Sequence, residues 1–245
     1  MTQLKTRRTM NSARALALLF VCVPLACKST ATSDAAKEAP ATATAPVAAP
    51  AATATTALPQ DSAKVAALGE LAPDFELPDL DGKPVQLADY RGKIVVLEWF
   101  NPDCPFVKAS HLKGSLLDAA KKASGNGVVW LAINSAAPGK QGHGAARNRE
   151  AKTEFKLTHP ILLDETGKVG KLYGAQRTPH MYVINAEGKL VYRGAIDNSP
   201  DGEGDSPKGG TLVRYVDEAI SGLTGSKPIA VADTEAYGCS VKYAN

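Results

Sequence analysis

Residues 94–108 read IVVLEWFNPDCPFVK, and the rest of the chain can be placed around this stretch. It opens with an apolar run that continues through Trp99 and Phe100 and is interrupted only by Glu98. A short apolar run that ends in turn residues favours a central strand buried on both faces. Residues 101–103, Asn-Pro-Asp, then end the predicted strand.

A helix is predicted directly after this strand. Pro105 suits the first helical position, because its missing N–H has no partner to lose there. Apolar residues then recur at a spacing near 3.6, although Gly114 interrupts the pattern: they occupy positions 106, 109, 112, 116, 117 and 120. Cys104 therefore lies where a buried strand leads into a helix N-terminus. Free N–H groups and the helix dipole stabilise an anion at such a place, which makes Cys104 the candidate nucleophile.

Read in register, this stretch resembles the active-site segment of thioredoxin-like proteins, which contains a strand, a Trp-bearing turn and a C-x-x-C helix. It is most similar to the redoxin branch, grouped with alkyl hydroperoxide reductase and thiol-specific antioxidant proteins. Residues 72–93 match the opening run of that branch, APDFxLxDxxGKxVxLxDxRGK. Thr178-Pro179 resembles the Thr-Pro that the fold uses as a cis-proline opposite the cysteine, and strands at 181–185 and 190–192 follow it. The resemblance covers roughly residues 66–225.

The sequence departs from both active sites that the resemblance implies. Val107 occupies the position of the second cysteine in C-x-x-C. A peroxiredoxin would have Pro and Thr where this chain has Leu97 and Asn101. Neither standard active site is complete.

The resemblance also implies roles for further residues. Glu98 matches the buried acid of thioredoxins, which takes up a proton during disulfide exchange. Desolvation predicts a raised pKa for it, and a partly hydrated acid at the end of the sheet is the alternative. Thr178-Pro179, if cis, would expose backbone near the thiol for pairing with an extended substrate, and a trans turn is the alternative. His180 is a candidate base or charge partner of Cys104, although such a histidine more often simply points along a strand.

Other side chains near the candidate site have less specific signals. Trp99 and Phe100 are predicted to be packing residues that also line part of the site, and Pro105 and Phe106 are predicted to line it. Arg193 is a candidate to stabilise a thiolate, with an exposed arginine at a strand end as the default interpretation. The histidines at positions 111, 143 and 159 show no ligand spacing and are interpreted as surface residues. No resident metal or cofactor is predicted.

The chain begins with a targeting pattern. Residues 1–26 contain four basic residues and then an apolar core of about eleven residues, which is typical of a signal peptide and too short to span a bilayer. The segment ends in PLAC and resembles the lipobox of bacterial lipoproteins, so Cys27 is the predicted site of lipid attachment. Cleavage and secretion without a lipid is the alternative. Either outcome places the protein in the cell envelope, and the lipid would hold it to a membrane on the periplasmic side.

Three further segments follow the signal peptide. Residues 27–61 are dominated by Ala, Thr, Pro and Ser and are predicted to be a disordered tether. Residues 62–225 are the predicted thioredoxin-like redoxin domain, and residues 226–245 are a tail that carries Cys239. Removing the four basic residues of the leader from the 28 of the whole chain leaves 24 against 25 acidic residues. This balance gives no basic face with which to bind nucleic acid.

The predicted elements of the domain alternate between strands and helices. A hairpin is expected at 75–77 and 85–87. After the central strand and helix come a buried strand at 128–133, a helix at about 145–156, a strand segment at 161–163, a helical turn at 169–173, the strand pair after the proline, a surface loop at 198–210 and a helix at 211–220. This order fits an α/β, thioredoxin-like three-layer sandwich with a mixed central sheet and an N-terminal hairpin extension.

The number of cysteines limits which residues can take part in thiol chemistry. Cys22 leaves with the signal peptide and Cys27 is committed to lipid or removed, so the exported domain keeps Cys104 and Cys239. Outside the cytosol two thiols tend to form a disulfide. Cys239 lies beyond the last predicted helix, in a tail with little core-forming character. On the functional interpretation, Cys239 is the resolving or pairing partner of Cys104. The alternatives are a static disulfide that only fixes the tail, or two thiols that never meet.

Three functions from different classes fit these observations. The first is a thiol–disulfide oxidoreductase or thiol peroxidase acting on protein or small-molecule thiols, disulfides or peroxides. Because the Pro and Thr of peroxiredoxins are absent, thiol exchange is slightly favoured over peroxide reduction. The second is Cu(I) handling by Cys104, Cys239 and His180 as a soft site. The third is a non-catalytic envelope binding domain held together by a Cys104–Cys239 staple.

Overall fold

The computed structural model describes residues 65–245. The predicted signal peptide 1–26, the lipid attachment at Cys27 and the tether 27–61 lie outside the described residues, as does the start of the domain at residue 62. Between residues 65 and 245, no helix combines the length and the apolar character that crossing a membrane requires.

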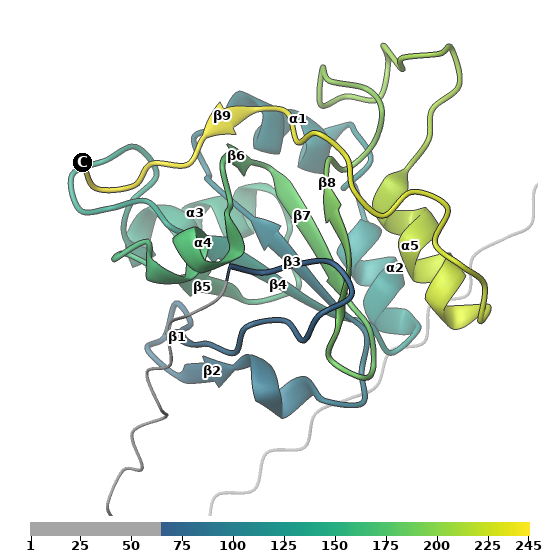
Figure 1. Cartoon of the computed structure of the whole chain (residues 1–245). Coiled ribbons are helices and arrows are strands. Elements are labelled where there is room, and N and C mark those ends of the chain that lie inside the picture. Colours follow the sequence, from purple (N-terminus) through teal and green to yellow (C-terminus); the bar gives the residue numbers. More distant parts are fainter. Residues whose placement is uncertain (1–64) are drawn as a thin grey trace, which may run out of the picture. The chain divides into compact units, whose positions relative to one another are not determined.

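A mixed five-stranded sheet forms the centre of the fold (Figure 1), with the strand order β5-β4-β3-β7-β8. Strands β3, β4 and β5 are parallel, whereas β7 runs antiparallel to β3 and β8 antiparallel to β7. Every residue of β3 is buried, as the apolar run predicted. The bounds are Val95–Trp99 for β3, Val129–Asn134 for β4, Ile161–Leu163 for β5, His180–Ile184 for β7 and Leu190–Gly194 for β8.

Helices cover both faces of this sheet and complete the three layers. Val96 and Val183, from one face, pack with α2 and α5, and α1 and α3 continue this layer around Ala132. Leu97, from the other face, packs with α4 and the N-terminal hairpin. The predicted α/β sandwich is therefore confirmed. The helices are α1 Pro105–Leu112, α2 Ala119–Gly125, α3 Ala145–Glu154, α4 Lys168–Tyr173 and α5 Tyr215–Thr224.

The N-terminal hairpin forms where it was expected. Strands β1 (Glu76–Pro78) and β2 (Pro84–Gln86) pair antiparallel, with Leu77 opposite Val85. Leu77 is buried in the main core, so the hairpin closes one side of the sheet. A 3₁₀ helix, Leu87–Tyr90, leads from the hairpin to the central strand.

Two predicted helices differ from the observed ones. The apolar pattern after Cys104 predicted one helix through position 120, but it is divided into α1 and α2. The chain breaks at Gly114, where a Cβ atom would overlap the carbonyl oxygen of Gly202, so a neighbouring loop occupies the space that a continuous helix would need. Helix α5 begins at Tyr215 rather than at position 211. The amide of Asn198 binds the backbone of residues 208, 211 and 213, and this keeps the segment before Tyr215 in the loop.

The tail beyond α5 is part of the fold, which its composition did not indicate. Residues 232–243, called the C-terminal strap from here on, run along β8 and the short strand β6, Arg177–Thr178 (Figure 1). The strap contains its own strand, β9 (Cys239–Ser240), which pairs antiparallel with β6. Backbone hydrogen bonds attach both of its ends: Arg193 N to Ala232 O, Thr234 N to Arg193 O, Val241 N to Gln176 O and Ala137 N to Lys242 O.

Candidate active site

Cys104 occupies the junction that the sequence predicted, between β3 and α1. It is the N-cap residue of α1, with an extended backbone, and Pro105 is the first helical residue. The side chain of Cys104 is 1% exposed, and its Sγ lies 3.0 Å from the carbonyl oxygen of Thr178. A thiolate at this place would face the unpaired N–H groups at the start of α1.

The strap brings the second cysteine of the domain to the first. The Sγ atoms of Cys104 and Cys239 lie 2.8 Å apart, and both residues are free thiols. At this separation the two sulfurs can bond to each other with little movement of the chain. The alternative in which the two thiols never meet is wrong. Burial, together with the hydrogen bond and charge of Cys104, raises the pKa of the Cys239 thiol to about 12.

The peptide bond Thr178-Pro179 is cis, as the resemblance implied. Thr178 lies opposite Cys239 in the β6–β9 ladder. The backbone that was expected to accept an extended substrate is therefore already paired with the protein's own strap.

Glu98 is fully buried, so the alternative of a partly hydrated acid is wrong. Its Oε1 lies 2.7 Å from Nε2 of His111, and its Oε2 accepts a hydrogen bond of 3.0 Å from the indole of Trp130. Burial alone raises the pKa of Glu98, but the charge and hydrogen bond of His111, the charge of His159 and the indole bond outweigh it. The pKa is lowered from its ordinary value of 4.5, which corrects the prediction of a raised value.

Two histidines that were interpreted as surface residues belong to this buried cluster. His111 is 3% exposed and stacks on Phe155 with their ring centroids 5.8 Å apart. His159 is 5% exposed, and its burial lowers its pKa to about 4. His143 is half-buried, with Nε2 3.0 Å from Glu165. The sequence does hold one signal for His111, because it lies about two helical turns after Cys104 on the inward face of the same helix.

Val107 replaces the missing second cysteine with a packed side chain. It is fully buried, in an apolar cluster that includes Phe100 and Ala132. Trp99 is also fully buried, but it packs in the core on the other face of the sheet and donates a 3.1 Å hydrogen bond to Ser135. Trp99 is thus a packing residue, as predicted, but it does not also line the site. Phe106 is half-buried and packs against the cluster that holds Cys104, while Pro105 is exposed.

His180 and Arg193 make their contacts elsewhere. Nδ1 of His180 accepts from the backbone N–H of Gln176 and lies 3.3 Å from the hydroxyl of Tyr182. Burial and the charge of Arg193 lower the pKa of His180 to about 4, so it is neutral at pH 7. Arg193 forms an ion pair with Asp233 of the strap at 2.8 Å, rather than facing a thiolate.

The Cu(I) hypothesis required Cys104, Cys239 and His180 to converge on one site. Within residues 65–245, no group of three or more His, Cys, Asp or Glu side chains is arranged to hold a metal ion. The soft site that this hypothesis needs is therefore not formed in the described part of the chain.

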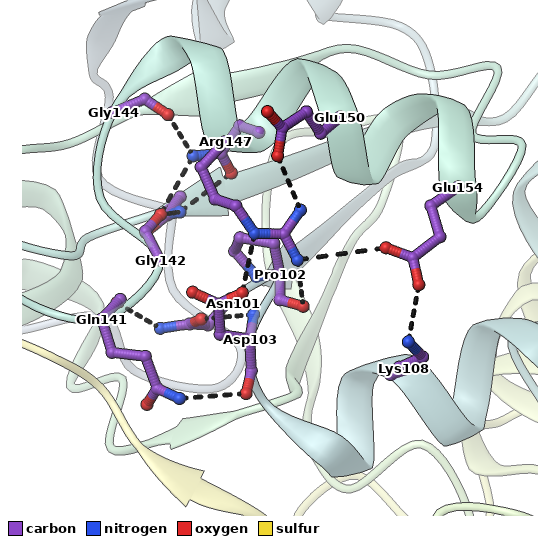
Figure 2. A network of polar contacts seen from close by, with 12 residues as sticks. Asn101, Pro102, Asp103, Lys108, Gln141, Gly142, Gly144, Arg147, Glu150 and Glu154 are labelled. Atoms are coloured by element: carbon purple, nitrogen blue, oxygen red, sulfur yellow. Dashed lines mark hydrogen bonds and ion pairs between the residues drawn. The ribbon is translucent and has the colours of Figure 1, made fainter.

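A polar network that the sequence did not reveal holds the turn before Cys104 (Figure 2). Asn101 Oδ1 accepts from the backbone N–H of Asp103, and Asn101 Nδ2 donates to the carbonyl oxygen of Gln141. Arg147, from α3, donates from Nε to Asp103 Oδ1 at 2.7 Å and from Nη2 to the carbonyl oxygen of Pro102 at 3.3 Å. Both α3 and the loop before it thus fix the turn that delivers Cys104.

A mixed five-stranded sheet, a cis-proline and a cysteine at a helix N-terminus together define a protein of the thioredoxin-like class. Within that class, the family model described as Redoxin matches residues 67–209, which is more than half of the chain. The chain belongs to the Redoxin family.

Several known proteins are similar to it. "Thiol-disulfide oxidoreductase ResA" of Geobacillus thermodenitrificans is 35% identical over 126 residues, which cover 51% of this chain and 67% of that protein. "Peroxiredoxin Q, chloroplastic" of Oryza sativa subsp. japonica is 29% identical over 131 residues, covering 51% and 57%. Among solved structures, an uncharacterized conserved protein from Geobacillus kaustophilus has a TM-score of 0.64 and 30% identity, covering 73% of this chain and 93% of that one. A hypothetical protein from Sinorhizobium meliloti has a TM-score of 0.63 and 27% identity, covering 73% and 95%.

Proposed function

We propose that this chain is a two-cysteine thiol redox enzyme, in which Cys104 is the nucleophile and Cys239 is the resolving residue. One observation carries the proposal: the two sulfurs lie 2.8 Å apart, with Cys104 at the N-terminus of α1. Its similarity to a thiol–disulfide oxidoreductase and to a peroxiredoxin supports the same chemistry.

The oxidising half of the cycle begins at Cys104. With a peroxide, the Cys104 thiolate attacks one oxygen, the O–O bond breaks, and a sulfenic acid and an alcohol or water form. The Cys239 thiol then attacks the sulfenic sulfur, and water leaves as the Cys104–Cys239 disulfide forms. With a disulfide substrate, a mixed disulfide on Cys104 takes the place of the sulfenic acid, and Cys239 expels the bound thiol.

The reducing half of the cycle starts at Cys239, because it is the more exposed of the two residues. An external thiolate attacks the Cys239 sulfur, and Cys104 leaves as a thiolate that the start of α1 stabilises. A second external thiol completes the reduction. The protein thereby gains two electrons and two protons, and the external thiols become a disulfide.

Glu98 has a positioning role in this proposal. Its lowered pKa makes it a weak base, and its carboxylate holds His111, whose Nε2 lies 2.7 Å from Oε1. The N-terminal sequence supports action in the cell envelope, on the periplasmic side, with a lipid at Cys27 as the anchor. A Cys104–Cys239 disulfide would persist in that compartment.

A thiol titration tests the proposal on protein that lacks residues 1–27, so that Cys104 and Cys239 are its two cysteines, with wild type beside Cys239→Ser. Each is measured with and without one equivalent of hydrogen peroxide. Wild type should end with no free thiol and with a Cys104–Cys239 link in peptide mapping, whereas the variant should stop at a sulfenic acid or mixed disulfide on Cys104. If Cys104 stays an unreactive thiol in both proteins, the enzyme proposal fails and the non-catalytic binding domain takes its place.

A further inference from the structure

The strap covers the strand edge beside the nucleophile. Thr178 of β6 pairs with Cys239 of β9, and the adjoining pair is Arg177 with Ser240. Gly238 passes so close to Thr178 that a Cβ atom would overlap the Thr178 carbonyl, and its φ of +113° also disfavours other residues. The strap therefore fits the edge of β6 closely, and it leaves Cys104 only 1% exposed.

This position matters because an extended polypeptide docks on a sheet edge by pairing with free backbone groups. At β6 the backbone groups are already paired with β9. A cysteine in a polypeptide could reach Cys104 by that route only after the strap had left.

Several side chains hold the strap in place in addition to its backbone bonds. The hydroxyl of Tyr237 donates to the buried carboxylate of Asp197 at 2.8 Å. The hydroxyl of Tyr243 donates to the carbonyl oxygen of Ala175 at 2.8 Å, beyond the other end of β9. Because anchors lie on both sides of Cys239, the strap is a fixed part of the site.

A cavity of about 490 Å³ lies against the strap, one residue away from Cys239 along the chain. It reaches Gly238, the neighbour of Cys239, and Arg177, the neighbour of Thr178. This volume lies in the range of about 300–1,000 Å³ that is typical of small-molecule sites. Its other lining residues include Asp197, Lys208, Tyr215 and Tyr237.

We propose that the C-terminal strap restricts the redox site to small thiol, disulfide or peroxide substrates, because it occupies the edge of β6 that an extended polypeptide would need. The inference rests on the proposed function, since it assigns the substrate class of the same sulfur pair. Small substrates approach through the cavity beside Gly238, and protein disulfides are excluded.

The test compares two probes that differ only in size. Both are mixed disulfides of thionitrobenzoate, one with free cysteine and the other with a cysteine inside a short unstructured peptide. Attack by the Cys104 thiolate forms a new disulfide and releases the same yellow thiolate in each case, so the ratio of the two rates isolates the effect of the polypeptide.

The comparison uses Cys239→Ser, which keeps the whole strap, and a chain that ends at residue 237, which lacks β9 and the part of the strap that follows it. Both proteins begin after Cys27 and neither has Cys239, so only Cys104 reacts. We expect the ratio of the peptide rate to the cysteine rate to be about tenfold higher in the shortened chain, because its β6 edge is free. Equal ratios in the two folded proteins would overturn the inference.

A point variant keeps the test decisive if the shortened chain does not fold. Gly238→Ala, combined with Cys239→Ser, should push the strap away from Thr178 and raise the rate ratio. Gly209→Ala is the matched control, because Gly209 also has a positive φ, of +87°, but a Cβ atom there would meet nothing within 4 Å. An unchanged ratio in the Gly238 variant would count against the strap. If Cys104 reacts with neither probe in any variant, the proposed function fails instead.

Discussion

Arg147 and Asp103 are joined by a hydrogen bond of 2.7 Å between Nε and Oδ1, next to the nucleophile (Figure 2). Asp103 immediately precedes Cys104, so its carboxylate would oppose a second negative charge on the sulfur. Arg147 is the cation that neutralises it, and the same guanidinium also holds the carbonyl of Pro102. The ion pair thus places the turn and balances its charge.

Removing this cation should slow the chemistry of Cys104. In the Cys239→Ser background, we expect Arg147→Ala to lower the rate of Cys104 alkylation by iodoacetamide at pH 7 by about threefold, since the ion pair is partly exposed and screened. The double variant Asp103→Asn/Arg147→Ala should recover most of the rate, because the opposing charge is also gone. A double variant as slow as the single one would show that Arg147 acts by holding the turn alone.

The buried carboxylate of Glu98 should be costly to delete and much less costly to neutralise. Glu98→Ala leaves His111 and Trp130 without their shared partner, and we expect a loss of about 3 kcal/mol in the free energy of unfolding. Glu98→Gln keeps an oxygen that can accept from Trp130 and an amide group that can bond to His111, so a loss of about 1 kcal/mol is expected. Urea unfolding at pH 7 measures both, and equal losses would contradict the assigned contacts.

His159 should make the fold sensitive to mild acid. Its pKa is lowered to about 4 in the folded protein, so between about pH 6.5 and 4 the unfolded chain binds a proton that the folded chain does not. The stability present above pH 6.5 is therefore lost as the pH falls through this window, by about 3 kcal/mol. His180 titrates in the same window, since its pKa is also lowered to about 4.

An apolar ring at position 159 should remove that part of the acid sensitivity. Neither ring nitrogen of His159 has a hydrogen-bond partner among the described residues, so His159→Phe sacrifices no bond there. We expect the difference in unfolding free energy between pH 8 and pH 5 to be smaller in the variant than in wild type. The measurement at pH 8 is the internal control, and an unchanged difference would exclude His159 as the source.

The central strand and the position of Cys104 could be predicted because their signals are local. An unbroken apolar run and a proline at the first helical position lie within a few residues of each other. The pairing of Glu98 with His111 could not be predicted in this way, because it joins two elements and depends on which helical face turns inward. The sequence therefore predicted a raised pKa for Glu98 from its burial alone. It did not reveal His111, which helps to lower that pKa.

The sequence did not predict the strap, for a different reason. Backbone hydrogen bonds attach it to β6 and β8, and such bonds leave almost no pattern in the sequence. The number of cysteines did indicate Cys239 as a partner of Cys104, but only as one of three alternative interpretations. The contact of 2.8 Å between their sulfurs depends on a two-residue strand that no periodicity indicates.

The break between α1 and α2 provides a final prediction, because helix propensity and packing give opposite expectations for it. Propensity favours alanine over glycine inside a helix by about 1 kcal/mol. At Gly114, however, a Cβ atom would overlap the backbone carbonyl of Gly202, which cannot move aside as a flexible side chain can. We therefore expect Gly114→Ala to lower the unfolding free energy by about 1–3 kcal/mol, in the range of overpacked core sites.

The matched control for this variant lies at the end of α2. Gly125 is exposed and helical, and a Cβ atom there would meet nothing within 4 Å, so Gly125→Ala should be neutral or slightly stabilising. Urea unfolding of both variants separates the two effects. If both substitutions stabilise the protein, the chain can continue as one helix past Gly114, and contact with the Gly202 loop is not what divides α1 from α2.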